Sequence, residues 1–275
     1  MRITLPRNLK RCGLKDNKMP RLILTTLKNA LIDLGNGLSF LKSIVKHLLK
    51  GHIRINEVSK QIYEQGVQSL PIIILTSLAT GVVLALQGIE MLIRFGAKDL
   101  VAQGVSWGLV REMSPLFTAI IFSAKAGAKI TAELGTMTVN DQILATRALG
   151  VDPVEFLIVP RILACFLVVP ILTIISEIVG IFGGYCVGTL DANIPGAYYL
   201  AQTFKTVRYV DFFSGFGKVF IFAILIGWIC CYQGFFTKGG SLGVGKYTAQ
   251  AVAYSIIFVI LSNTVLTKLM IMLWG

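Results

Sequence analysis

The chain has 275 residues, of which 55% are hydrophobic and 15% are charged, and its mean hydropathy is +0.73. This composition excludes an ordinary soluble domain, because several apolar runs approach the roughly 20 residues that a helix needs to cross a bilayer. The net charge of +12 does not indicate nucleic-acid binding, because 13 of the 26 Lys and Arg residues lie in residues 1–66 beside four acidic residues. That distribution is typical of a segment facing anionic lipid on the cytosolic side. We therefore expect an all-α, multi-pass membrane protein with no nucleic-acid partner.

The N-terminal quarter of the chain is basic and divides into two parts. Residues 1–20 predict a disordered tail, and no cleavable signal peptide is evident in them. Residues 21–66 predict an amphipathic helix and a connector, because leucines such as Leu41 fall on one helical face and lysines such as Lys46 on another. This helix is expected to lie in the membrane interface. A cytosolic helix packed on a partner protein is the open alternative.

The rest of the chain, residues 67–275, predicts a membrane domain. With residues 1–66 inside, the inside segments hold 19 Lys and Arg residues and the outside loops hold four, which places the N-terminus in the cytosol. A polar segment at about 125–155 then lies on the cytosolic side. The five apolar runs predict spans at about 68–93, 100–124, 162–190, 216–236 and 249–274.

Four polar residues fall inside or beside the predicted spans. Arg111 and Glu112 lie near the middle of the second span, Glu177 lies in the third, and Gln87 lies near the end of the first. Ionisable groups at membrane depth usually face a cavity, a partner charge or the bundle interior. We assign these four residues to a substrate cavity. The alternative for Arg111 and Glu112 is a structural ion pair at a helix break near Pro115.

The remaining motifs are structural. Gly180, Gly184 and Gly188 recur every four residues, a spacing that lets another helix approach closely. The five cysteines have no CxxC spacing, so neither a metal site nor a disulfide framework is indicated. Residues 240–246 match seven positions of an ATP-binding loop, but Tyr247 stands where Ser or Thr is needed. We interpret that segment as a flexible turn between two spans.

Several motifs in and around the polar segment resemble those of the MlaE/YrbE permease family, membrane subunits of ABC transporters that move lipids between membranes. The resemblance covers most of the chain, from about residue 66 to the C-terminus. The basic tail is not explained by it, and Lys125 stands where Arg is expected. The motifs are LQG at 86–88, REMSPLFTA at 111–119, AKAGAKITAELGTM at 124–137, Gln142, ALGVDP at 148–153 and PR at 160–161.

The resemblance implies the architecture, the partners and the location. It implies an interfacial helix, five spans, and a cytosolic coupling helix at roughly 128–149 that docks on a cytosolic ABC ATPase. Two permease subunits form a lipid-holding cavity, and an MCE-type substrate-binding protein lies on the far side. No cofactor is bound directly, since ATP and magnesium belong to the ATPase. The location is a bacterial inner membrane or a plastid inner envelope.

The resemblance also implies roles for single residues. The predicted contacts with the ATPase are Glu133, Gly135, Met137 and Gln142. Arg111 and Glu112 match the family's charged pair near the lipid cavity, where a cation can meet a phosphate headgroup.

Two other functions stay open. One is a stand-alone, ion-coupled secondary transporter or channel with Glu112 and Glu177 as ion or proton sites, although no internal repeat is evident. The other is a membrane scaffold that binds partners through its basic tail.

Overall fold

The computed structural model describes residues 35–48, 54–97 and 100–274. The tail at 1–20 and the first part of the predicted interfacial helix lie outside these residues. The chain divides into two units, residues 1–46 and residues 47–275. In the first unit the described residues are helical, and Phe40 and Ile44 are buried while Leu38 and Val45 are exposed. Its placement in a membrane interface stays a prediction.

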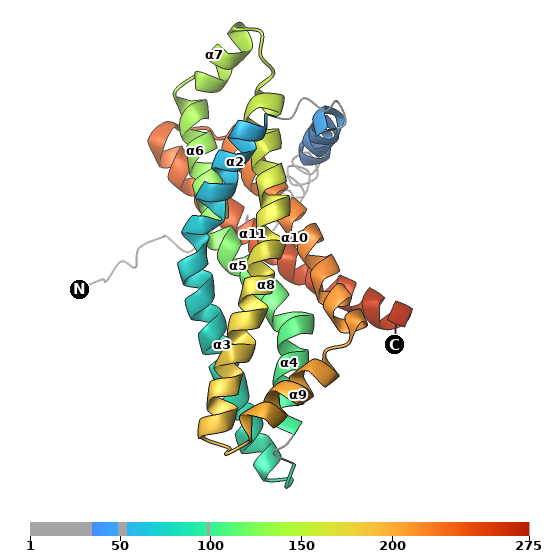
Figure 1. Cartoon of the computed structure of the whole chain (residues 1–275). Helices are drawn as coiled ribbons and strands as arrows, with labels where there is room; N and C mark the ends of the chain where they lie inside the picture. Colours follow the sequence, from blue (N-terminus) through green and yellow to red (C-terminus); the bar gives the residue numbers. More distant parts are fainter. Residues whose placement is uncertain (1–34, 49–53, 98–99, 275) are drawn as a thin grey trace, which may run out of the picture. The chain divides into compact units, whose positions relative to one another are not determined.

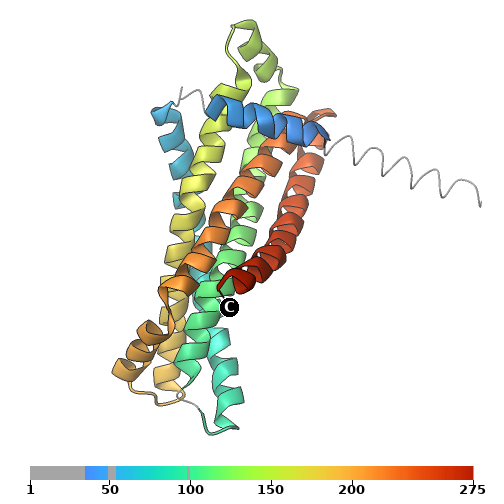
Figure 2. The ribbon, with the colours of Figure 1, turned by 90° about the vertical axis from the view of Figure 1, so that its right-hand side faces the viewer.

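The second unit is a bundle of helices, and its described residues contain no β-strand. Figures 1 and 2 show α3, α8 and α10 running along the bundle, with α7 at one end and α9 near the other. The helices are α2 (Ile55–Gln65), α3 (Leu70–Ile93), α4 (Val101–Gly108), α5 (Ser114–Phe122), α6 (Ala128–Val139), α7 (Gln142–Ala148), α8 (Val159–Leu190), α9 (Gly196–Thr206), α10 (Tyr209–Phe235) and α11 (Gly240–Trp274).

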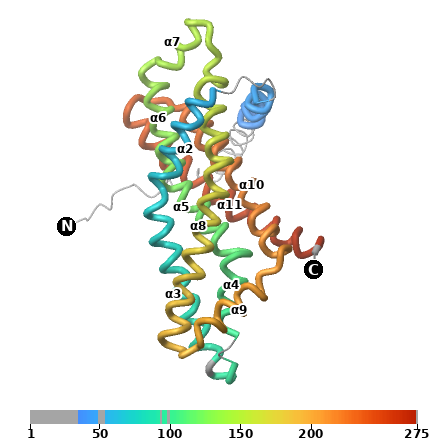
Figure 3. Tube along the Cα trace, in the orientation of Figure 1, coloured from blue at the N-terminus to red at the C-terminus, as the bar shows by residue number. Residues whose placement is uncertain are grey.

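Four helices of the described chain are long and apolar enough to cross a membrane. They are Ile55–Leu92, Val154–Leu190, Tyr209–Phe235 and Gly240–Leu273. The segment predicted as the second span is helical but interrupted, because a π-helical segment, Leu109–Met113, separates α4 from α5. A second π-helical segment, Ser123–Gly127, joins α5 to α6. Figure 3 shows α4, α5 and α6 following one another along the bundle.

The structure corrects the predicted coupling helix at 128–149. It is two helices, α6 and α7, separated by Asn140 and Asp141. Asp141 has φ +57°, a left-handed conformation that Asp and Asn adopt more readily than most residues and that ends the run of α6. α6 is joined to α5 through its π-helical segment and belongs to the bundle, so only α7 projects from the end of the bundle (Figure 1).

Three predicted connections are also shorter than expected. The connector before the first span contains α2, and the interval 191–215 between the third and fourth predicted spans contains α9. The flexible turn predicted at 240–246 is wrong, because α11 is helical from Gly240 onward, although Gly239 and Gly240 both have positive φ. Gly239 and Gly240 form the turn, because glycine adopts positive φ without strain. Gly243 and Gly245 lie within the first turns of α11.

The closest packing in the bundle lies between α3 and α8. A Cβ atom on Gly81 of α3 would lie 1.9 Å from the carbonyl oxygen of Gly180 in α8, so the two backbones touch there. At the α9 end of this contact, a cluster of buried apolar side chains from α3, α4 and α8 surrounds Tyr199 of α9. These contacts hold α4 and α9 in place, and both helices contribute to the pocket described next.

Candidate functional site

The π-helical segment Leu109–Met113 sends its two charged side chains to different partners. Arg111 Nη1 lies 3.4 Å from Asp211 Oδ1 in the first turn of α10, and its guanidinium stands 5.1 Å from the ring centre of Trp107. The indole Nε1 of Trp107 also donates to Asp211 Oδ1, at 3.3 Å. Arg111 is therefore paired with α10 and does not pair with Glu112.

Glu112 lies at the centre of a polar cluster between α10 and α11. Lys218 Nζ donates to Glu112 Oε1 at 2.7 Å, and the Lys218 side chain is fully buried. Thr267 Oγ1 donates to the same carboxylate at 3.0 and 3.1 Å, and Asn263 Nδ2 donates to Oε2 at 3.2 Å. Lys218 Nζ also donates to the carbonyl oxygen of Arg111 at 3.3 Å. A buried ammonium group thus has its charge balanced inside the bundle.

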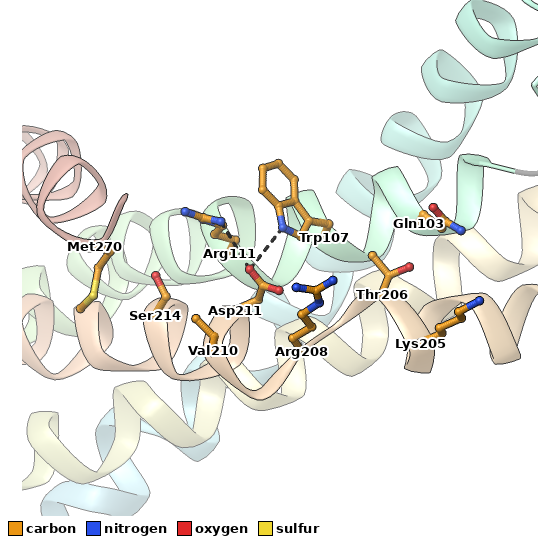
Figure 4. Close-up of a pocket in the computed structure, with 10 residues that line it drawn as sticks. All are labelled: Gln103, Trp107, Arg111, Lys205, Thr206, Arg208, Val210, Asp211, Ser214 and Met270. Carbon is orange, nitrogen blue, oxygen red and sulfur yellow. Dashed lines mark hydrogen bonds and ion pairs between the residues drawn. The ribbon is translucent and has the colours of Figure 1, made fainter. Parts of the chain in front are cut away.

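Each member of the charged pair opens into a pocket of its own. The Arg111 pocket has a volume of about 550 Å³. In the view of Figure 4, Arg111 and Arg208 lie on either side of Asp211. Its lining residues are Gln103, Trp107, Arg111, Lys205, Thr206, Arg208, Val210, Asp211, Ser214 and Met270. A second, more open pocket of about 480 Å³ is lined by Glu112, Asn263, Thr264, Thr267, Lys268, Ile271 and Met272.

The other two residues assigned to the cavity line neither pocket. Gln87 is exposed on α3. Glu177 is 5% exposed on α8, and its Oε1 has no hydrogen-bond partner among the described residues. Within one chain, then, the structure does not bring the four predicted residues into a single cavity.

The sequence reasoning missed the partners of the charged pair. Lys218 is a single cation inside an apolar run, which was a usable signal. Asn263 and Thr267 are spaced four residues apart on one face of the last apolar run. Asp211 fell in a predicted loop, so nothing in the sequence linked it to Arg111, which lies 100 residues earlier.

The four residues predicted to contact an ATPase have different surroundings. Glu133 forms an ion pair with Arg161 at 3.4 Å, and Arg161 is only 4% exposed. Gly135 is buried, and a Cβ there would lie 3.0 Å from Thr237 Oγ1. Met137 is half-buried and Gln142 is exposed on α7. Glu133 and Gly135 therefore make contacts within the bundle.

Glu133 belongs to a charge network that joins α2, α6 and α8. Lys129 Nζ lies 3.3 Å from Glu64 Oε2 and 3.7 Å from Glu133 Oε1. Arg161 Nη1 donates to the carbonyl oxygen of Leu157 at 2.7 Å, in the π-helical segment Val154–Ile158. The network ties the end of the bundle nearest α7 to the helices that continue into its centre.

The glycines of α8 lie at helix contacts. A Cβ on Gly180 would meet Leu109 at 3.3 Å, and a Cβ on Gly184 would lie 2.8 Å from both Val105 and the hydroxyl of Tyr199. A Cβ on Gly188 would lie 2.7 Å from the Tyr199 ring. Burial raises the pKa of Tyr199 to about 12, so its phenol stays neutral at ordinary pH. The glycines thus make room for α4 and α9 beside α8.

Comparison with known proteins places the chain in a family. Residues 58–269 match the family described as Permease MlaE. A probable ABC transporter permease protein of Rickettsia typhi is 34% identical over 82% of this chain and 87% of its own length. The intermembrane phospholipid transport system permease protein MlaE of Haemophilus influenzae is 34% identical over 77% of this chain and 81% of its own. A probable ABC transporter permease protein of Pyropia yezoensis is 32% identical over 81% of this chain and 85% of its own. The chain is therefore a member of the MlaE permease family.

Proposed function

We propose that this chain is the non-catalytic membrane subunit of an ABC-type transporter that moves phospholipids. A separate cytosolic ATPase supplies the energy, an MCE-type protein binds the lipid on the far side, and two copies of the chain form the permease. The observation that carries this proposal is the 34% identity, over 77% of the chain, with a relative named for intermembrane phospholipid transport.

The two pockets support a lipid substrate. The Arg111 pocket joins cationic groups to the apolar surfaces of Trp107, Val210 and Met270, and a phospholipid needs both kinds of contact. The pocket beside Glu112 is lined by Ile271 and Met272 together with polar groups. A charged residue that opens into a pocket within a membrane bundle is a functional site by default.

The topology that we propose has five crossings. The run from α4 through α5 forms the fifth span, with its π-helical segment at the level of Arg111 and Glu112. The Lys and Arg asymmetry places α7 in the cytosol and α9 on the far side. Relatives in Haemophilus influenzae and in Pyropia yezoensis favour a bacterial inner membrane or a plastid inner envelope.

The structure revises the surface that we propose for the ATPase. α7 projects from the end of the bundle, and Leu144 is 63% exposed on it, with Leu149 82% exposed just beyond. Exposed leucines beside Gln142 suit a protein contact, whereas Glu133 and Gly135 transmit motion from inside the bundle. Met137, half-buried at the end of α6, lies between these two groups.

An affinity purification tests the proposal. The full chain, solubilised in mild detergent, should carry with it a protein bearing ATP-binding motifs and should contain bound phospholipid. The variant L144E should lose the ATPase, because a carboxylate replaces an apolar contact on α7. The control L242E changes a leucine that is 88% exposed at the start of α11 and should keep the ATPase.

The stand-alone transporter makes the opposite prediction. If the purified chain, without any ATPase, carried out ion-driven flux that E177Q abolished, the ABC assignment would be wrong. Recovery of the ATPase by L144E as well as by L242E would leave the transporter class intact and would move the docking surface away from α7.

A further inference from the structure

We propose that the Arg111 pocket is a headgroup site that selects phospholipids of net negative charge over zwitterionic ones. This inference rests on the proposed function and adds the substrate class. The residues that set the selectivity are Lys205 at the end of α9 and Arg208 just before α10.

The charges that line the pocket do not balance. Three cations and one carboxylate line it, and the carboxylate, Asp211, is already paired with Arg111 at 3.4 Å. The side chains of Lys205 and Arg208 are exposed and form no ion pair or hydrogen bond with any residue that the structure describes. Two cationic groups thus remain available to an anionic ligand.

The backbone around Arg208 adds to the same attraction. Arg208 occupies the N-cap position of α10, a helix of 27 residues, and no side chain caps that end. The first N–H groups of a helix lack intrahelical partners and carry a partial positive charge. Val210, in the first turn, lines the pocket, so the helix end faces the ligand space.

A buried polar group in the pocket lacks a partner. Ser214 lies one turn after Asp211 and is 2% exposed, and its Oγ makes no hydrogen bond to any described residue. Leaving a buried hydroxyl unpaired is costly, so Ser214 Oγ is available to bond an atom of a ligand in this pocket. A hydroxyl can donate to a phosphate oxygen or to a glycerol hydroxyl of the headgroup.

The same arrangement disfavours a zwitterionic headgroup. An ammonium group of ethanolamine or choline needs a carboxylate or an aromatic face. Asp211 accepts hydrogen bonds from Arg111 and from Trp107, both at Oδ1, and the guanidinium of Arg111 stands over the ring of Trp107. The guanidinium therefore offsets the charge of Asp211, and Lys205 and Arg208 repel a further cation.

Lipid retention from a defined bilayer tests this inference. The full chain is reconstituted in vesicles of equimolar phosphatidylglycerol and phosphatidylethanolamine with matched acyl chains, then extracted in mild detergent. Native mass spectrometry gives the amount and the headgroup of the retained lipid. The wild type should retain phosphatidylglycerol in roughly threefold excess over phosphatidylethanolamine. Ion pairs of the exposed Lys205 and Arg208 with an anionic headgroup are weak enough to predict a modest preference of this size. The variant K205Q/R208Q should retain both lipids equally.

Two further variants separate a pocket from general surface charge. K238Q/K246Q removes two exposed cations beyond the other end of α10, about 40 Å away along the helix, and should leave the threefold excess unchanged. S214V keeps every charge, fills part of the pocket and should lower the amount of retained phosphatidylglycerol. Inorganic phosphate added during extraction should not displace the lipid, whereas displacement would assign the site to a free anion.

The outcomes distinguish this inference from the proposed function. Equal retention of the two lipids by the wild type, or the same loss of preference in K238Q/K246Q as in K205Q/R208Q, would overturn the selectivity while leaving lipid binding intact. Absence of any retained phospholipid in the wild type would overturn the proposed function itself.

Discussion

At the scale of single residues, the site depends on charges that are paired across helices. Lys218 is fully buried, and Glu112 is the only carboxylate among the described residues with which it forms an ion pair. Breaking such a pair costs more than removing both partners, because one uncompensated charge is left in a poorly solvated place. The pair joins the π-helical segment Leu109–Met113 to α10, and the bonds from Asn263 and Thr267 to the same carboxylate add α11.

The variant K218M should be less stable than the wild type by about 1–3 kcal/mol, because Glu112 loses its cation but is 29% exposed and keeps its bonds from Thr267 and Asn263. The double variant E112Q/K218M should recover most of the loss, since no charge is then unpaired. R94M is the control, because the Arg94–Glu90 pair is about three-quarters exposed on both sides and contributes little. Equilibrium unfolding in mixed micelles measures all three. A double variant no more stable than K218M would show that the pair does not stabilise the bundle.

For each of the two charged interactions, the sequence identified one partner, Arg111 or Glu112, and not the residue that it contacts. Arg111 and Glu112 stood out because charges are rare in an apolar run, and both line pockets. Their neighbours in space come from α10 and α11, about 100 and 150 residues away, and no local pattern encodes such distances. Glu133 was selected from a motif as a surface contact. Its ion pair with Arg161 is a tertiary contact that the motif does not reveal.

At the scale of helices, hydropathy located the long apolar helices well and their ends poorly. α8, α10 and α11 all begin before the predicted spans, since polar and glycine-containing turns continue the helix beyond the apolar part. The second predicted span divides at Leu109–Met113, where a π-helical segment inserts one extra residue per turn. Hydropathy measures how apolar a segment is, and it carries no information on the hydrogen-bond pattern within a helix.

The contact between α3 and α8 gives a prediction at this scale. G81A should destabilise the bundle by about 1–3 kcal/mol, because the added methyl group overlaps the carbonyl of Gly180 and the helices must separate. G104A, in α4, has no atom within 4 Å of the new Cβ and should be neutral or slightly stabilising. The free energies of unfolding of the two variants and the wild type, measured under the same conditions, make the comparison. Equal stability of G81A and wild type would mean that the helices do not pack this closely.

At the scale of the whole chain, the number of crossings decides which surfaces face the cytosol and which face the far side. Four helices of the described chain are long and apolar enough to cross, and the run from α4 through α5 is the proposed fifth span. With five crossings, α2 and α7 lie on the same side of the membrane. With four, they lie on opposite sides, and the pocket beside Lys205 would open to the cytosol.

Thiol labelling in intact cells distinguishes the two topologies. Cysteines are introduced singly at Lys60 in α2, Arg147 in α7 and Lys205 in α9, all of which are exposed side chains. A membrane-impermeant maleimide added outside should label K205C at once, and should label K60C and R147C only after the membrane is permeabilised. The unmodified chain, in which Cys165, Cys230 and Cys231 are buried and Cys186 is half-buried, gives the background labelling. Labelling of R147C but not K60C before permeabilisation would mean that the run from α4 through α5 does not cross. The docking surface proposed on α7 would then face away from a cytosolic ATPase.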